Sequence, residues 1–70
     1  MIARTRGRVT AFDGRRGLGE ITTEDGRTFA FHSTAIADGS RKIAEATEVE
    51  FDVEAGLPGR WEATAIKKCG

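Results

Sequence analysis

Few residues in this chain of 70 carry reactive or metal-ligating side chains, and their spacing forms no catalytic set. His32 is the single histidine, and Ser33 and Thr34 follow it directly. Neighbouring residues of a strand point to opposite faces, so this order does not pair a base with a nucleophile. Cys69 is the single cysteine and lies far from His32 in the sequence. We therefore expect no catalytic site, metal site, cofactor or internal disulfide.

Two short motifs indicate a different chemistry, because they combine cations and rings with glycine-rich strands. Residues 16–21 read Arg-Gly-Leu-Gly-Glu-Ile, and residues 29–33 read Phe-Ala-Phe-His-Ser. A guanidinium group pairs with phosphate and stacks on bases, and an aromatic ring also stacks on bases. The glycines are explained most simply by strand curvature in a tight barrel, not by a phosphate-binding loop.

The charges sum to zero but are unevenly distributed along the chain. The 11 basic and 11 acidic residues cancel, whereas a dedicated duplex binder is usually clearly basic. Five arginines lie in the first 16 residues, and five carboxylates lie between residues 45 and 54. This pattern predicts a basic side and an acidic side, although either cluster could equally be a solvated face.

Length and composition indicate one small soluble domain, residues 1–70, with a core at about 7–67. No apolar run is long enough for a membrane span or a signal peptide, so a cytoplasmic location without membrane contact is expected. Because no disulfide or metal can hold so short a chain, a closed barrel is favoured over an open sheet.

Turn dipeptides at short intervals separate five runs of strand length. The predicted strands cover about 6–13, 17–23, 27–32, 47–55 and 60–67, which predicts an all-β, five-stranded antiparallel closed β-barrel. In the fourth run Val49, Phe51 and Val53 alternate with acidic residues, as in a half-buried strand. A bulge is expected to shift the alternation in the fifth run. The predicted core is Val9, Ile21, Phe29, Phe31, Ile36, Val49, Phe51 and Ile66.

The connections between these runs also carry predictions. Asp25-Gly26 is typical of a two-residue type I′ hairpin turn. Residues 33–46 form the longest connection, in which Ser33 could cap a short helical turn through Ala37. One more helical turn could form at residues 41–46. Residues 56–59, Gly-Leu-Pro-Gly, are read as a loop.

The order of these motifs resembles the cold-shock domain, an OB-fold barrel, over about residues 7–67. Gly7-Arg-Val-Thr-Ala-Phe-Asp13 is similar to the family's first strand, and residues 16–21 and 29–33 are similar to its two ribonucleoprotein motifs. Thr34-Ala35-Ile36, Val49-Glu-Phe51 and the loop at 56–59 follow in the family's order. The resemblance implies binding of single strands through an aromatic face ringed by Lys and Arg.

The chain departs from the family pattern at the positions that carry this aromatic face. Ala11 stands where the first-strand Trp is expected, and Leu18, Glu20, Ala30 and Ser33 stand where the motifs carry Phe. Stacking contributes about 1–3 kcal/mol per base, so these changes imply weak binding. Glu20 adds a negative charge where phosphate would approach.

The sequence thus predicts weak, non-catalytic binding of single-stranded RNA or DNA by a monomer. Eight residues are predicted to contact the nucleic acid: Arg8, Phe12, Arg15, Arg16, Leu18, His32, Arg41 and Trp61. Lys42 is expected on the same rim. Trp61 is expected near the gap left by Ala11, as a relocated stacking platform, or else as a packing residue at one barrel end. The alternative is a protein-interaction module that kept the barrel, lost nucleic-acid binding and meets a basic protein partner through its acidic fourth strand.

Overall fold

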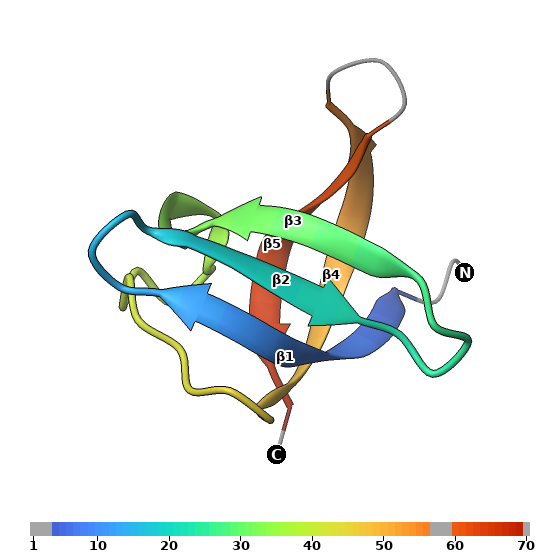
Figure 1. Ribbon diagram of the computed structural model, residues 1–70, viewed down its shortest axis with the longest axis horizontal. Helices are drawn as coiled ribbons and strands as arrows, with labels where there is room; N and C mark the ends of the chain where they lie inside the picture. The colour runs from blue at the N-terminus through green and yellow to red at the C-terminus, as the bar shows by residue number, and fades with distance from the viewer. Residues whose placement is uncertain (1–3, 57–59, 70) are drawn as a thin grey trace.

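Five strands close into a barrel in the computed structural model, which describes residues 4–56 and 60–69 (Figure 1). The predicted all-β barrel is confirmed, and each strand begins and ends within one residue of the predicted position. The last residues of the loop predicted at 56–59 lie outside the described residues. The elements are β1 (Thr5–Asp13), β2 (Leu18–Thr22), β3 (Thr28–His32), the 3₁₀ turn η1 (Ser33–Ala35), β4 (Glu48–Ala55) and β5 (Trp61–Lys68).

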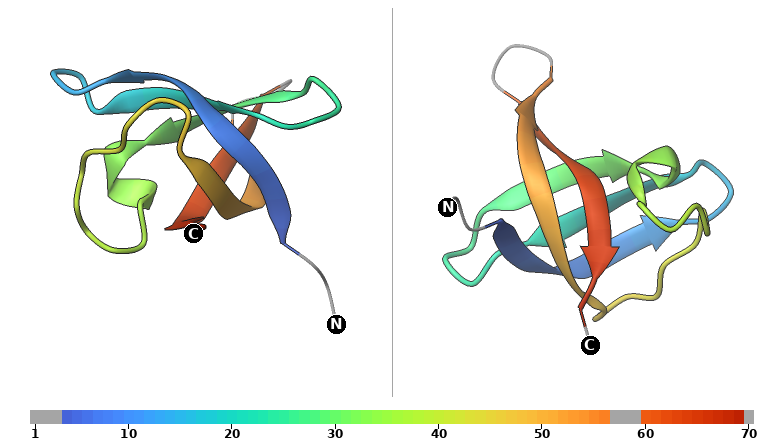
Figure 2. Two further views of the ribbon diagram at one scale, coloured as in Figure 1. Left: turned by 90° about the horizontal axis from the view of Figure 1, so that it is seen from below. Right: turned by 180° about the vertical axis from the view of Figure 1, so that it is seen from behind.

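The strand order around the barrel is β1-β2-β3-β5-β4, and β4 pairs back with β1. The first three strands form one curved layer, and the β4–β5 hairpin crosses behind it (Figures 1 and 2). The prediction of purely antiparallel pairing is wrong at one seam, because β3 and β5 run parallel and pair through Ala30 and Glu62. A closed ring with an odd number of strands cannot alternate in direction throughout, so one parallel seam is unavoidable.

Two bulges adjust which side chains enter the barrel. In β1 the register shifts between Val9 and Ala11, so Thr10 is the extra residue opposite β2. Between β4 and β5 the register shifts so that β5 has one residue more, and Ala65 adopts a φ of 50° there. This bulge leaves Ala65 exposed and turns Ile66 fully inward, which confirms the shift of alternation predicted for the fifth strand.

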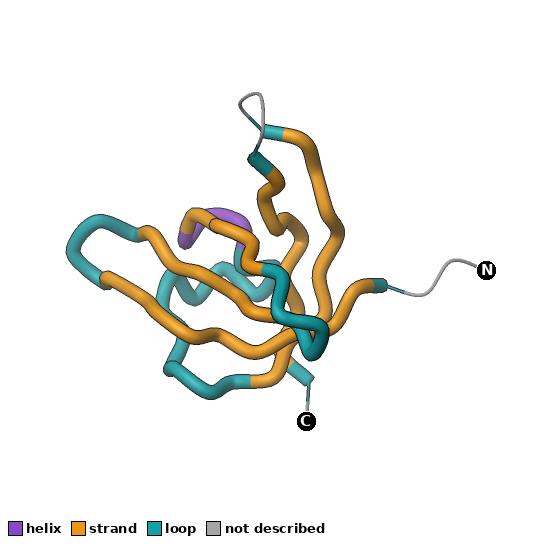
Figure 3. The backbone as a smooth tube through the Cα atoms, turned by 45° about the vertical axis from the view of Figure 1, so that its right-hand side comes forward, coloured by secondary structure: helices purple, strands orange, loops and turns teal. Residues whose placement is uncertain are grey.

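The core contains every residue predicted for it, and two that the sequence analysis missed. The additional residues are Ile43 and Ala63, with 6% and 3% of their surface exposed. Ile43 belongs to the long connection, which passes over the barrel end after η1 (Figure 3). No helix forms at residues 41–46, so that prediction is wrong. Arg41 and Ala46 have φ angles of 58° and 71°, which a right-handed helix does not accommodate.

The β2–β3 hairpin also differs from the predicted two-residue turn. The Gly26 N–H donates to the Thr23 carbonyl at 2.9 Å, so Glu24 and Asp25 are the central residues of the turn. Gly26 follows with a φ of 88°, and the Thr23 N–H donates to the Arg27 carbonyl at 2.9 Å. The glycine therefore takes the left-handed bulge position of a longer hairpin loop, and not the second position of a type I′ turn.

Within residues 4–56 and 60–69, no helix is long and apolar enough to cross a membrane.

Candidate nucleic-acid interface

The β1–β2 loop holds two arginines beside the end of β3. The Asp13 carboxylate accepts hydrogen bonds from the backbone N–H of Arg15 at 3.0 Å and of Arg16 at 3.3 Å. The Gly17 N–H donates to the Asp13 carbonyl, and the Gly17 carbonyl accepts from the Ser33 N–H, both at 2.8 Å. The loop is therefore hydrogen-bonded to β1 and to Ser33, the first residue of η1, and Arg15 and Arg16 are both exposed on it.

The exposed side of β1, β2 and β3, here called the outer face, carries the predicted contact residues in cross-strand rows. Asp13 pairs with Leu18, and Leu18 pairs with His32. Leu18 is 37% exposed, and His32 is exposed at the end of β3. The structure thus brings Leu18 and His32 together, next to the loop of Arg15 and Arg16.

The next row of the outer face contains no ring. Ala11 pairs with Glu20, and Glu20 pairs with Ala30. Glu20 and Ala30 are exposed, and Ala11 is half-buried. Gly19, on the opposite side of β2, is needed because a Cβ there would lie 2.4 Å from the Phe31 ring. The Glu20 carboxylate therefore lies between two alanines, Ala11 and Ala30, in a row without an aromatic side chain.

Phe12 lies in the inward-facing row with Gly19 and Phe31, at the barrel end that the long connection borders. Its half-buried ring stacks on Phe31, with ring centroids 6.0 Å apart and planes inclined by 9°. A shallow hollow of about 500 Å³ lies along it, lined by Phe12, Gly14, Lys42, Ile43, Ala44, Thr47 and Lys68. Lys42 thus lines this hollow with Phe12, and Arg41 precedes it as an exposed residue.

Asp38 fixes the other end of this connection. Its carboxylate accepts from the Ser40 backbone N–H at 2.9 Å and lies 3.2 Å from the Lys68 ammonium. Hydrogen bonding to Ser40, and then to Lys68, lowers the pKa of Asp38 to about 2. Lys68 is therefore occupied by a carboxylate, whereas Lys42 forms no ion pair with any described residue.

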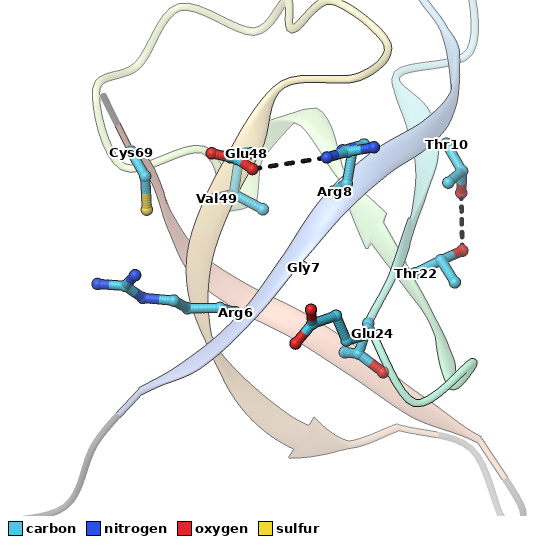
Figure 4. A pocket seen from close by; sticks show the side chains of 10 residues that line it. Arg6, Gly7, Arg8, Thr10, Thr22, Glu24, Glu48, Val49 and Cys69 are labelled. Carbon is cyan, nitrogen blue, oxygen red and sulfur yellow. Dashed lines mark hydrogen bonds and ion pairs between the residues drawn. The ribbon is translucent and has the colours of Figure 1, made fainter.

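The predicted basic and acidic sides do not exist as separate surfaces, so that expectation is wrong. The antiparallel β1–β4 register places Arg6 opposite Glu50 and Arg8 opposite Glu48. Figure 4 shows the Arg8–Glu48 pair, 3.5 Å apart, at the rim of a hollow of about 490 Å³ beside Cys69. Three of the five residues in each cluster form ion pairs with the other cluster, which are Arg4–Asp52, Arg6–Glu50 and Arg8–Glu48.

Charge pairing therefore distinguishes the predicted cationic contacts. Arg8 is engaged with Glu48 on the β4 side of β1. Arg15, Arg16 and Arg41 form no ion pair with any residue in 4–56 or 60–69. Among the predicted cationic contacts, those without an ion pair in the described residues therefore lie in the β1–β2 loop and the long connection.

Trp61 lies away from the position expected for it. It lines a hollow with Arg27, Thr28, Phe29 and Val53, and not with Ala11. The strands β2 and β3 separate Ala11 from β5, so Trp61 does not fill the gap at Ala11. It is 59% exposed, and its alternative role as a packing residue at one barrel end stays a prediction.

No group of three or more metal-ligating side chains occurs in the part of the chain that the structure describes.

Comparison with known proteins assigns the barrel to a family. The family model described as the 'Cold-shock' DNA-binding domain matches residues 5–69. Cold shock-like protein CspC of Bacillus cereus is 38% identical over 63 residues, which are 89% of this chain and 97% of that protein. Cold shock-like protein CspE of Buchnera aphidicola is 36% identical over 67 residues, with 93% and 97% of the two chains covered. Glycine-rich protein 2 of Nicotiana sylvestris is 40% identical over 65 residues, but this chain spans only 30% of its length. The chain belongs to the cold-shock domain family, whose members generally bind nucleic acid.

Proposed function

We propose that this protein binds single-stranded RNA or DNA weakly and without catalysis, through the outer face of its first three strands. One observation carries the proposal: the β1–β2 loop holds Arg15 and Arg16, which have no carboxylate partner among the described residues, beside the Leu18–His32 row. Cations next to exposed apolar and ring side chains are the general arrangement for binding single strands.

The contacts divide into ionic and stacking contributions. Arg15 and Arg16 are proposed to pair with phosphates, with Arg41 and Lys42 extending the cationic rim past Phe12. The His32 ring is proposed to stack on a base, with its cross-strand partner Leu18 as an apolar contact beside it. The half-exposed edge of Phe12 is proposed as a further stacking contact at the neighbouring barrel end. Arg8 is left out of this set because Glu48 already holds it.

Weakness follows from the centre of the outer face. The row of Ala11, Glu20 and Ala30 offers no ring for stacking, and the Glu20 carboxylate repels phosphate. Each missing platform removes about 1–3 kcal/mol of binding free energy. We therefore expect binding that is mostly ionic and falls steeply with added salt.

An NMR titration tests this proposal. Hexathymidylate and hexauridylate are added to the 15N-labelled protein at low salt and again at 0.5 M salt. The expected result is shifts of the amides of Arg16, Leu18 and His32 that require millimolar ligand and vanish at high salt. A double variant, Arg15→Ala with Arg16→Ala, should bind more weakly, whereas the control Arg6→Ala should bind almost as the wild type, because Arg6 pairs with Glu50. No shift at millimolar ligand and low salt would refute nucleic-acid binding, and tight binding at 0.5 M salt would refute its ionic character.

The alternative, a protein-interaction module that has lost nucleic-acid binding, gains no support. Its argument was an acidic fourth strand that could meet a basic partner. Glu48 and Glu50 of that strand are instead paired with arginines of β1, and Asp52 is paired with Arg4, which precedes β1. The monomeric state and the cytoplasmic location stay predictions.

A further inference from the structure

Two of the three large hydrophobic side chains exposed in the described residues lie together, away from the Leu18–His32 row. They are Val53 and Trp61, with 39% and 59% of their surface exposed. They line one hollow of about 350 Å³ together with Arg27, Thr28 and Phe29. The third exposed hydrophobic residue, Leu18, is already part of the outer face.

The hollow lies between the ends of two hairpins, and a network of hydrogen bonds orients its cation. Arg27 comes from the β2–β3 turn, and its Nε donates to the Asp25 carboxylate at 2.8 Å. The Thr23 hydroxyl donates to the same carboxylate, and this bond, with smaller contributions from Arg27, lowers the pKa of Asp25. The guanidinium carbon of Arg27 lies 5.6 Å from the centroid of the Phe29 ring. A planar cation is thus held in place beside an exposed indole.

These groups match one kind of ligand. An indole, a guanidinium plane and a valine side chain offer flat contact that suits a nucleobase. Asp25 already pairs with the charge of Arg27, so the contact expected from Arg27 is stacking and not phosphate pairing. We infer that the hollow of Arg27, Val53 and Trp61, here called the indole hollow, is a second base-binding site on the strand held by the outer face. This inference rests on the proposed function.

The spacing between the two sites suits one continuous strand. Thr28 lines the indole hollow, and His32 lies at the other end of the same strand β3. Four residues of a β-strand span about 13 Å. A stacked single strand at about 3.4 Å per nucleotide covers this distance in about four steps, so a hexanucleotide reaches both sites.

Trp61 is the only tryptophan and the chain has no tyrosine, so intrinsic fluorescence reports on this hollow alone. Hexathymidylate added at low salt should quench the emission of Trp61 with the same midpoint as the amide shift of His32. Trp61→Ala should weaken binding about 5- to 140-fold, which is the value of one stacked base, and Trp61→Phe should restore part of this loss. Arg27→Ala should also weaken binding. The matched control is Arg6→Ala, because Arg6 is likewise an exposed arginine paired with a carboxylate, Glu50.

The outcomes separate this inference from the proposed function. In one outcome, hexathymidylate shifts the amide resonance of His32, the emission of Trp61 stays unchanged, and Trp61→Ala binds as the wild type does. This outcome would overturn the second site and leave binding at the outer face in place. Absence of any binding would overturn both. If Trp61→Ala does not fold, Val53→Ser gives the same test at a neighbouring wall of the hollow, with weaker binding expected and unchanged binding contradicting the inference.

Discussion

Restoring rings at the centre of the outer face should convert this protein into a tighter binder of single strands. Glu20 and Ala30 are direct cross-strand partners, and both are exposed. The change is the double variant Glu20→Phe with Ala30→Phe. Cross-strand aromatic pairs stabilise a sheet by about 0.2–1 kcal/mol, so the variant should fold at least as well as the wild type.

The magnitude follows from the number of platforms gained. Two new rings at about 1–3 kcal/mol per stacked base contribute about 2–6 kcal/mol. At 1.4 kcal/mol per factor of ten, the affinity should rise by about one to four orders of magnitude. Removing the charge alone, in Glu20→Gln, should raise it by less than about tenfold, because salt screens an exposed carboxylate.

The assay is a fluorescence-anisotropy titration with labelled hexathymidylate at 0.15 M salt, with far-UV dichroism to verify folding. The single variants Glu20→Phe and Ala30→Phe complete a double-mutant cycle. Glu54→Phe is the control, because it exchanges an exposed carboxylate for a ring on β4, outside the outer face.

Two results would contradict the reasoning. A folded double variant that binds no better than the wild type would show that the outer face is not where bases lie. An equal gain in affinity for Glu54→Phe would show that any exposed ring attracts the oligonucleotide. The gain could then not be assigned to the positions of Glu20 and Ala30.

Three further predictions concern the ionic contacts and the fold. Removing Arg15 and Arg16 together should reduce the slope of log affinity against log salt by about 1.4, since each phosphate contact on a single strand contributes about 0.7, and an unchanged slope would exclude both as phosphate ligands. Phe31→Ala should lower the free energy of unfolding by about 3–5 kcal/mol in urea titrations, because the ring is 2% exposed, and a loss below about 1 kcal/mol would show that Phe31 is not central to the core. Because the pKa of Asp38 is lowered to about 2, its stabilising effect should be complete above about pH 4 and vanish as the pH falls toward 2. The stability difference between wild type and Asp38→Asn, measured by denaturation between pH 2 and 6, should shrink over that window, and a constant difference would refute the role of the carboxylate.

The sequence predicted the barrel because its strongest signals are local. Alternation in β4 and the turn residues between the strands are properties of neighbouring residues, and they placed the strand ends closely. The errors occurred where distant contacts decide the local structure. Ile43 enters the core from a connection in which Arg41 and Ala46 adopt left-handed backbone conformations. The alternation of apolar and polar residues that predicts strands gives no indication of a buried residue in such an irregular segment. The bulge glycine of the β2–β3 hairpin was likewise misplaced, because an Asp-Gly pair is compatible with two turn geometries.

The predicted contact residues stay a prediction, and what the structure adds to them is charge pairing. Arg8 and Arg16 look alike in the sequence, yet only the β1–β4 register reveals that Arg8 faces Glu48. The sequence analysis named Trp61 as a nucleic-acid contact but expected it near Ala11 and did not connect it with Arg27. Arg27 and Trp61 are 34 positions apart in the sequence (61 minus 27), and they come to line one hollow because β3 and β5 are neighbouring strands.

The net charge of zero does not mean that every part of the surface is neutral, because the three ion pairs of Arg4, Arg6 and Arg8 lie on one side of the barrel. Exposed ion pairs contribute little to stability, about 0–1 kcal/mol each, so the ladder between β1 and β4 is not what holds the barrel together. Its larger effect is to cancel the field of three arginines on one side of the molecule. The cations of the β1–β2 loop are not cancelled in this way by any described residue. A chain with no net charge can therefore still present a local positive field to a phosphate backbone, and it presents that field beside the Leu18–His32 row.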